Sequence, residues 1–424
     1  MFTSSRKNNI KVCSALVSNG SVNHKSAKRL TQLARRVSNR ANYLMRKDLF
    51  TGRKPNQSKI DKLLKQGKLC LQDKELYCRL PNSVSQRAIQ IVGDNWKAFA
   101  ASKSDWKKHP EKYKGMPRPP KYSRSAKTVY ISCANFSIRD GYIYFSQRLN
   151  LLPIKTYFPN QPVNPKADTK TITEIRLVPK GSTFVFEFVY YDFSPNDSQE
   201  PLDESSFMAI DLGVNTFTAI VSNQAVFQPI LVNGGLLKRI NSYYNKRCAE
   251  LRSNKKHCHI KAVAQKRNRK IKDQIHKISR YIANLCSIYD IGTVILGKNK
   301  DWKHESSMGK ANNQNFTNIP HCQFINILAY KLKDIGANLV IQEESYTSKA
   351  SYVDNDSIPT YGKCKTKPVF SGYRKTRGLY KSKISNCLIS ADLNGAANIA
   401  KKAGYEGVSL VSRGVVDTPI VINV

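Results

Sequence analysis

The sequence has few acidic residues for its length. Of 424 residues, 30 are Asp or Glu and 70 are Lys or Arg, which gives a formal net charge of +40. Solubility alone does not require such an excess of one sign. It predicts a polyanionic partner, either a nucleic acid or an acidic membrane surface.

The sequence also lacks long apolar runs. None approaches the ~18–20 residues that span a bilayer, and residues 1–12 are basic without the apolar core of a secretory signal. Nucleic acid is therefore the favoured partner. At 40% hydrophobic and 9% aromatic residues, the chain is too rich in core-forming side chains for a disordered basic tail. Its length predicts two or three domains.

Paired cysteines are a third absence. The ten cysteines are scattered, and no two stand in C-x-x-C spacing. This favours buried or inert thiols in a reducing compartment over a disulfide framework. The triplet His257-Cys258-His259 is discounted as a metal site, because adjacent residues do not face one point and no second ligand pair follows.

The first half of the chain has a mixed pattern. Asp140-Gly141 is a strong hairpin signal between two short strands. We expect a small β-rich domain with a helical insertion after its first strand, and an acidic linker over 192–206. The pattern predicts strands over 11–17, 128–132, 136–139, 142–145, 171–178 and 183–191, and helices over 26–50 and about 82–101, the two separated by a Gly/Pro/Lys-rich connector.

The second half predicts an α/β domain. Its strands and helices are expected over 207–211, 217–222, 225–232, 236–288 (a long basic helical region), 291–296, 320–335, 338–343 and 390–401. An antiparallel meander followed by alternating helices and strands is the RNase H-like order. Enzymes of this fold carry carboxylates at the ends of central strands, where two divalent ions bind ~3.5–4 Å apart.

Two acids lie where that chemistry needs them. Asp211 ends an apolar strand in an Asp-x-Gly sequence, in which Gly213 is expected to let a phosphate backbone approach. Asp392 falls in the first turn of the last helix, which carries small residues suited to tight packing on a sheet. Alone, the first could cap a turn and the second could offset the helix dipole.

Together, these motifs resemble the TnpB family of transposon-encoded, RNA-guided DNA nucleases, which are related to the compact type V CRISPR effectors. The resemblance is sharp over about 207–402 and looser before it. The matching pieces are AIDLGVN (209–215), GKNKDWK (297–303), ESYTSKASYVDND (344–356), FSGYRKTRGLY (370–380) and ISADLNGAANIAKK (389–402).

The resemblance implies a RuvC-type, RNase H-like nuclease domain preceded by a wedge-type β-barrel with an inserted helical recognition lobe. The expected division is a wedge-like barrel over 1–20 and 120–200, a recognition lobe over 21–119, a nuclease domain over 203–405 and a tail over 406–424. Within the nuclease domain, residues 235–288 form a basic helical insert, and the loop 345–388 stands in place of a zinc ribbon.

One departure from the family concerns the second acid. Gly297 stands where the fourth strand of the family carries Glu. The strand ending near Glu343 and Glu344 is expected ~4.8 Å away and parallel to it, and these two neighbours face opposite sides. Some family members that resemble this chain carry the ESYTSK motif together with a fourth strand that lacks the usual Glu. This favours Glu344 as the acid that takes the place of that Glu. The alternatives are an inactive nuclease, which we rank second, and two ordinary strand-end acids.

The other departure concerns zinc. Between Ser345 and Ala391 the chain has only Cys364 and Cys387 and no His. A closed structural site needs four such ligands, so no zinc is expected there. The basic residues of this loop are expected to touch phosphates or to fold against the sheet.

By this resemblance, Asp211, Glu344 and Asp392 form the catalytic and metal-binding set, with Mg²⁺ or Mn²⁺ as the cofactor. The implied partners are a guide RNA encoded by the mobile element and double-stranded target DNA beside a short flanking motif, in the cytoplasm and nucleoid of a prokaryote. Expected nucleic-acid contacts are Arg267, Arg269, Lys270, Lys298, Lys300, Lys349, Arg374, Arg377 and Lys383.

Two other interpretations stay open at this point. One is an RNA-guided DNA-binding repressor that does not cut. The other is a transposase or resolvase acting without RNA, against which the large N-terminal half and the charge of +40 argue.

Overall fold

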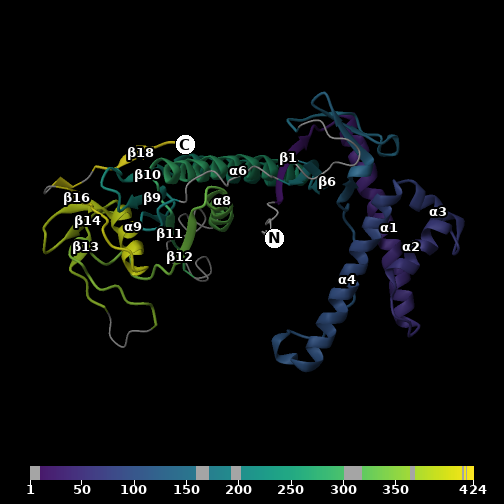
Figure 1. Ribbon diagram of the computed structural model, residues 1–424, viewed down its shortest axis with the longest axis horizontal. Coiled ribbons are helices and arrows are strands. Elements are labelled where there is room, and N and C mark those ends of the chain that lie inside the picture. Colours follow the sequence, from purple (N-terminus) through teal and green to yellow (C-terminus); the bar gives the residue numbers. More distant parts are fainter. Residues whose placement is uncertain are drawn as a thin grey trace, which may run out of the picture. The chain divides into compact units, whose positions relative to one another are not determined.

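The computed structural model describes residues 10–158, 171–191, 202–299, 318–362, 368–412, 415–416 and 418–424 (Figure 1). The chain divides into two compact units, Met1–Pro195 and Asn196–Val424. Most of the acidic linker predicted over 192–206 lies outside the described residues.

In its described residues, the first unit combines strands with two long helices and two short ones. Its strands are β1 (Ile10–Val17), β2 (Val129–Ser132), β3 (Phe136–Arg139), β4 (Tyr142–Phe145), β5 (Ile154–Lys155), β6 (Thr171–Lys180) and β7 (Thr183–Tyr191). Its helices are α1 (Val22–Phe50), α2 (Gln57–Gln66), α3 (Leu71–Cys78) and α4 (Asn82–Lys108), with 3₁₀ turns at Pro110–Lys112, Cys133–Asn135 and Gln147–Leu149.

These strands form two sheets. One has the antiparallel order β1-β7-β6-β2, and the other has the order β3-β4-β5. Asp140 and Gly141 both adopt positive φ between β3 and β4, as the predicted hairpin turn requires. Among the described strands no hydrogen-bonded ladder joins the two sheets, so closure into a barrel stays a prediction.

The observed boundaries of α1 and α4 differ from the predicted ranges, 26–50 and about 82–101. Helix α1 begins earlier than residue 26, because the Ser21 hydroxyl accepts a hydrogen bond from the backbone N–H of His24. Helix α4 extends past residue 101 to Lys108, since nothing breaks it until His109 and Pro110. A proline disfavours helical geometry in the residue before it, which accounts for the end of α4 at Lys108.

The segment predicted as a connector contains two helices, so that prediction was wrong. Helix α2 is capped by Asn56, whose side chain accepts from the backbone N–H of Lys59, and ends at Gly67 in the left-handed region. Helix α3 carries Asp73, which pairs with Arg40 of α1 at 2.7 Å. Short amphipathic helices without a long periodic run are weak signals in sequence, and tertiary packing stabilises them.

Helices and strands of the first unit share one hydrophobic core. Buried side chains of α1 and α4, such as Leu30 and Ile89, belong to the same cluster as Ile131 of β2 and Phe186 of β7. The regions assigned to a wedge and to a recognition lobe are therefore joined by apolar packing.

The second unit contains the remaining elements. They are β8 (Phe207–Leu212), β9 (Thr216–Ser222), β10 (Ile230–Asn233), α5 (Gly235–Ser253), α6 (His257–Ile288), β11 (Thr293–Gly297), α8 (His321–Asp334), β12 (Asn338–Gln342), β13 (Gly372–Arg374), β14 (Leu379–Ser382), β15 (Leu388–Ser390), α9 (Ala391–Lys402), β16 (Val411–Ser412), β17 (Val415–Val416) and β18 (Ile420–Ile422).

A six-stranded sheet forms the centre of this unit, in the order β12-β11-β8-β9-β10-β18. Strands β8, β9 and β10 are the expected antiparallel meander, and β11 and β12 run parallel to β8. This mixed α/β arrangement fits the predicted RuvC-type domain. The tail departs from its assignment outside the domain, because β18 pairs with β10 and extends the sheet.

Helices cover both faces of this sheet (Figure 1). Met208 and Ile210 of β8 belong to a core cluster with residues of α6 and α8, while Phe207 and Ala209 belong to a cluster with α9. The alternation follows from the two-residue period of a strand. Asp211 therefore shares the α9 face of β8.

Candidate active site

The side chain of Asp211 lies against α9. A Cβ atom at Gly395 would stand 2.7 Å from Oδ2 of Asp211, so only glycine allows the helix this close. Gly213 has a different role from the expected phosphate approach. A Cβ there would stand 2.4 Å from the carbonyl oxygen of Thr216, so Gly213 is needed for the tight turn between β8 and β9.

Asp392 lies one helical turn before Gly395, on the same side of α9. Its Oδ2 accepts a 2.7 Å hydrogen bond from the hydroxyl of Thr216, and its Oδ1 lies 3.6 Å from Nη2 of Arg374. The Asp392 side chain is 33% exposed, so it faces solvent as well as Asp211. Strand ends β8 and β9 and helix α9 thus bring two carboxylates together.

Glu344 reaches the same place from the neighbouring strand. Gly297 ends β11, and its register partner is Gln342 of β12. A Cβ at Gly297 would stand 2.7 Å from Oε2 of Glu344 and 2.5 Å from Cδ1 of Ile399. The Glu344 carboxylate therefore fills the space in which a side chain at 297 would begin.

The local backbone fixes this position of Glu344. Its N–H donates to Oδ1 of Asn299 at 3.0 Å, and its carbonyl oxygen accepts from the Thr347 hydroxyl at 2.8 Å. The Oε2 atom is buried and has no hydrogen-bond partner. A buried carboxylate oxygen without a donor is costly, which points to an absent positive partner.

The electrostatics link the three acids. Burial, then repulsion from Asp211 and from Glu343, raises the pKa of Glu344 to about 8. Burial, then repulsion from Asp392, raises the pKa of Asp211 to about 7, with Arg374 acting in the opposite direction. Asp211 therefore interacts with an acid on either side, and a cation would relieve both repulsions.

The residues at this site suit hard divalent metal ions such as Mg²⁺ or Mn²⁺. Their donors are carboxylate oxygens, and the unpaired Oε2 of Glu344 is a free ligand position. Within the described residues, however, no three His, Cys, Asp or Glu side chains stand close enough to form a ready-made cluster. The carboxylates lie close enough to repel one another but would have to draw together around an ion.

Glu343 is engaged elsewhere. Its Oε2 lies 2.5 Å from Nζ of Lys402, and its Oε1 accepts from the backbone N–H of Ser345 at 2.7 Å. Burial opposes ionisation of Glu343, but hydrogen bonds from Lys402 and Ser345 outweigh it and lower the pKa. Lys402 also donates to the carbonyl oxygen of Ser345 at 2.8 Å. This ion pair joins the end of α9 to the end of β12.

The loop over 345–388 is held by an aspartate–serine cluster, made of Asp354, Asp356, Ser351, Ser371, Ser382 and Ser385. Asp354 accepts from the hydroxyls of Ser382 at 2.6 Å and Ser351 at 2.7 Å. Asp356 accepts from the backbone N–H of Ser351 at 2.7 Å and the hydroxyl of Ser371 at 2.6 Å. Hydrogen bonds to two carboxylates thus close this loop on itself.

Buried amides attach the same loop to α9. Asn394 and Asn398 are fully buried, and both donate to the carbonyl oxygen of Ala350, at 2.8 and 2.7 Å. Sequence reasoning missed these two residues; the available signal was two amides on an otherwise apolar helix. The absence of zinc stays a prediction, because Cys364 lies outside the described residues.

The predicted nucleic-acid contacts differ in their surroundings. Arg267 is half-buried, and its guanidinium donates a hydrogen bond to Oδ1 of Asn241 at 2.8 Å. Part of its hydrogen-bonding capacity is therefore used within the protein. Lys298 lines a cavity of about 1020 Å³ with Asn299 and Glu343. Lys300 lies outside the described residues. The others are exposed, namely Arg269, Lys270, Lys349, Arg374, Arg377 and Lys383.

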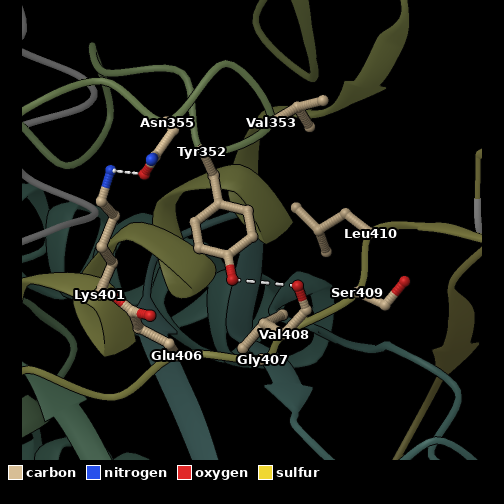
Figure 2. Close-up of a pocket in the computed structure, with 9 residues that line it drawn as sticks. All are labelled: Tyr352, Val353, Asn355, Lys401, Glu406, Gly407, Val408, Ser409 and Leu410. Atoms are coloured by element: carbon tan, nitrogen blue, oxygen red, sulfur yellow. Dashed lines mark hydrogen bonds between the residues drawn. The ribbon is translucent and has the colours of Figure 1, made fainter.

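A separate cavity lies at the C-terminal end of α9 (Figure 2). Its polar groups mostly bond to one another, as in the 3.0 Å hydrogen bond from the Tyr352 hydroxyl to the carbonyl oxygen of Val408. Lys401 likewise donates to Oδ1 of Asn355. None of the predicted site residues lines this cavity.

One family model matches the chain. Residues 189–303 match OrfB_IS605, described as a probable transposase. This segment includes Asp211 and Gly297, and the match supports the predicted resemblance to TnpB over that part of the chain. The displaced glutamate and the missing zinc ligands stay predictions.

Two solved structures are similar at low identity. One is a cryo-EM structure of a Cas12f1–sgRNA–target DNA complex, with 15% identity, a TM-score of 0.38, and coverage of 93% of this chain and 99% of that chain. The other is a CRISPR–Cas12f ternary complex, with 13% identity, a TM-score of 0.34, and coverage of 88% and 80%. No curated protein matches the chain.

None of the helices in the described part of the chain has the length and apolar character to cross a bilayer.

Proposed function

We propose that this protein is an RNA-guided DNA endonuclease of an insertion sequence, and that Asp211, Glu344 and Asp392 form its metal-binding active site. The observation that supports this most is the position of Glu344. Its carboxylate occupies the space above Gly297, has an unpaired buried oxygen, and repels Asp211. A buried carboxylate oxygen without a partner is costly, and a bound cation would offset that cost.

The three carboxylates have a shared part in the proposed reaction. Asp211 interacts with both other acids, and Asp211, Glu344 and Asp392 would together hold the cations. When bound, Mg²⁺ or Mn²⁺ would activate the attacking water and neutralise charge on the phosphodiester. Gly297 and Gly395 keep the space around the carboxylates free of other side chains.

Arg374 would take part in substrate binding. In this structure its guanidinium balances Asp392 at 3.6 Å and is 43% exposed, so it can leave the carboxylate at little cost. In the complex the guanidinium would contact a phosphate beside the scissile bond. The aspartate–serine cluster and β13 hold the segment that carries it.

The charge of the chain supports the proposed partners. A net charge of +40 suits a protein that holds a guide RNA and its DNA target by their backbones. Sequence recognition would come from pairing with the guide, and the protein would read only a short flanking motif.

The test is to sequence RNA that copurifies with the protein, then to assay a plasmid library for cleavage with that RNA and Mg²⁺. Guide-dependent cuts beside a fixed motif would support the proposal. A defined RNA with target binding but no cut would indicate the repressor. Cleavage or strand transfer without RNA would indicate the transposase or resolvase.

A further inference from the structure

A groove between α5 and α6 is not used by the proposed active site. The two helices are joined by residues 254–256, and so short a connection makes them antiparallel neighbours. The groove has a volume of about 410 Å³. Its floor includes the half-buried side chains of Ile240, Tyr244 and Val263.

The rim of this groove is strongly cationic. No carboxylate lines it, whereas Arg239, Arg247, Lys266, Arg267 and Lys270 do. Arg247 forms an ion pair with Glu250 at 2.8 Å. Arg267 lies above the ring of Tyr244, with its Cζ 5.5 Å from the ring centroid. The groove therefore combines an apolar floor with a rim that suits an anionic ligand.

An exposed aromatic ring completes the groove. Tyr243 lines the groove, and its side chain is 64% exposed. Exposed aromatic rings beside cationic side chains are the arrangement on which proteins stack unpaired bases, because every base has a flat face and an attached phosphate. Neither a metal nor a neutral apolar ligand would use both features.

We propose that the α5–α6 groove binds one unpaired nucleotide from a loop or bulge of an RNA. Its volume is at the lower end of the range for small-ligand sites, about 300–1,000 Å³, which suits one nucleotide and excludes a duplex. Proteins recognise RNA chiefly at unpaired bases splayed from loops, which they stack on aromatic rings or guanidinium planes. The base would stack on Tyr243, and Lys266 and Lys270 would hold its phosphates.

This inference rests on the proposed function only for the choice of RNA as the partner. The groove shares no residue with the carboxylate site, so a binding assay without metal tests it separately from cleavage. The probe is a short hairpin RNA with the fluorescent base aminopurine in its loop. A blunt RNA duplex of equal length and a DNA hairpin of the same sequence are the comparisons.

The expected result is loss of loop recognition by the full-length variant Tyr243→Ala. Its affinity for the hairpin should fall about 5- to 100-fold, with loss of the fluorescence change, while duplex affinity stays the same. Tyr243→Phe should retain both. Lys266→Ala should weaken hairpin binding more than Lys277→Ala, which removes a charge on α6 outside the groove.

Three results would overturn the inference. If Tyr243→Ala binds the hairpin as tightly as the unmodified protein, the ring does not stack a base. If hairpin and duplex affinities fall together, the groove contacts only backbone. If the DNA hairpin binds at least as well and depends equally on Tyr243, the occupant is single-stranded DNA. Thermal unfolding of each variant excludes misfolding as the cause.

Discussion

The carboxylate of Glu344 lies directly over Gly297, with Oε2 only 2.7 Å from the point at which a Cβ of residue 297 would stand. Gly297 ends β11, and Glu344 follows the end of the adjacent parallel strand β12, so an acid moved from one position to the other keeps its carboxylate in nearly the same place. The absence of a side chain at Gly297 therefore leaves the space that the Glu344 carboxylate occupies.

Substitution of the relocated acid gives the first prediction. Glu344→Gln should lower the cleavage rate at least about 10²-fold, because it removes one charged metal ligand. Asp211→Asn and Asp392→Asn should act alike, and guide and target binding should persist in all three. Plasmid cleavage and gel-shift assays measure the two effects.

The matched control is Glu343→Gln, which should keep most of the cleavage activity, because Glu343 is paired with Lys402. Its thermal stability should fall instead, since the substitution removes the charged partner of Lys402, whose side chain is only 6% exposed. An inactive Glu343→Gln together with an active Glu344→Gln would reverse the assignment of the two acids.

The glycine gives the second prediction. Gly297→Ala places a methyl group 2.5 Å from Cδ1 of Ile399 and 2.7 Å from the Glu344 carboxylate. We expect it to destabilise the fold by about 1–3 kcal/mol and to reduce cleavage by displacing Glu344. Gly378→Ala is the control, since a Cβ there has no atom within 4 Å. Equal unfolding temperatures for the two variants would contradict the close approach.

The third prediction concerns pH in metal-free buffer. The pKa values of Asp211 and Glu344 are raised to about 7 and about 8, above the ~4 of unfolded carboxyls. Their contribution to stability is therefore full below about pH 4 and is lost as pH rises towards 8. Glu344→Gln should raise the unfolding temperature relative to the unmodified protein at about pH 8 and much less at about pH 5.

Metal should act in the opposite direction in this experiment. Mg²⁺ binds the ionised carboxylates, so its apparent affinity should increase as pH rises through 7 to 8. It should also stabilise the unmodified protein more than Glu344→Gln. Thermal unfolding with and without Mg²⁺ measures both effects, and identical pH profiles for the two proteins would refute them.

The fourth prediction concerns salt. If many of the 70 basic residues contact phosphates, the affinity for RNA should fall steeply as salt increases. The slope of log affinity against log salt should be several units, close to the number of phosphates neutralised. Filter binding over a salt series measures this slope. A flat response would mean that backbone contacts contribute little to binding.

The aspartate–serine cluster gives the fifth prediction. Asp354→Ala removes the acceptor for Ser351 and Ser382 and should destabilise the second unit by about 2 kcal/mol or more. Asp273→Ala, which removes an exposed acid of the same unit, should have little effect. Thermal unfolding distinguishes the two variants.

Metal analysis completes this test. The protein as purified should contain no stoichiometric zinc, and in Mg²⁺-free buffer a zinc-selective chelator should leave its unfolding temperature unchanged. One zinc per chain would mean that ligands for it exist in the loop or elsewhere, and that the aspartate–serine cluster is not the main closure of the loop.

Much of the second unit was determined by local sequence. The apolar run of β8, the strand patterns that follow it and the small residues of α9 act over a few neighbours, so they predicted the antiparallel meander and placed Asp211 and Asp392 at element ends. The match of residues 189–303 to the family model agrees with these signals. Strand and helix periods are local properties, which is why they could be read without the structure.

Only the tertiary structure decided the rest. Helices α2 and α3 depend on packing against α1, and β18 depends on pairing with β10 from far along the chain. The different surroundings of Glu343 and Glu344 arise from Lys402 and Gly297, which are distant in sequence. Two adjacent glutamates are the same residue type at a strand end, and only the groups that other segments bring beside them distinguish an ion pair from a carboxylate without a partner.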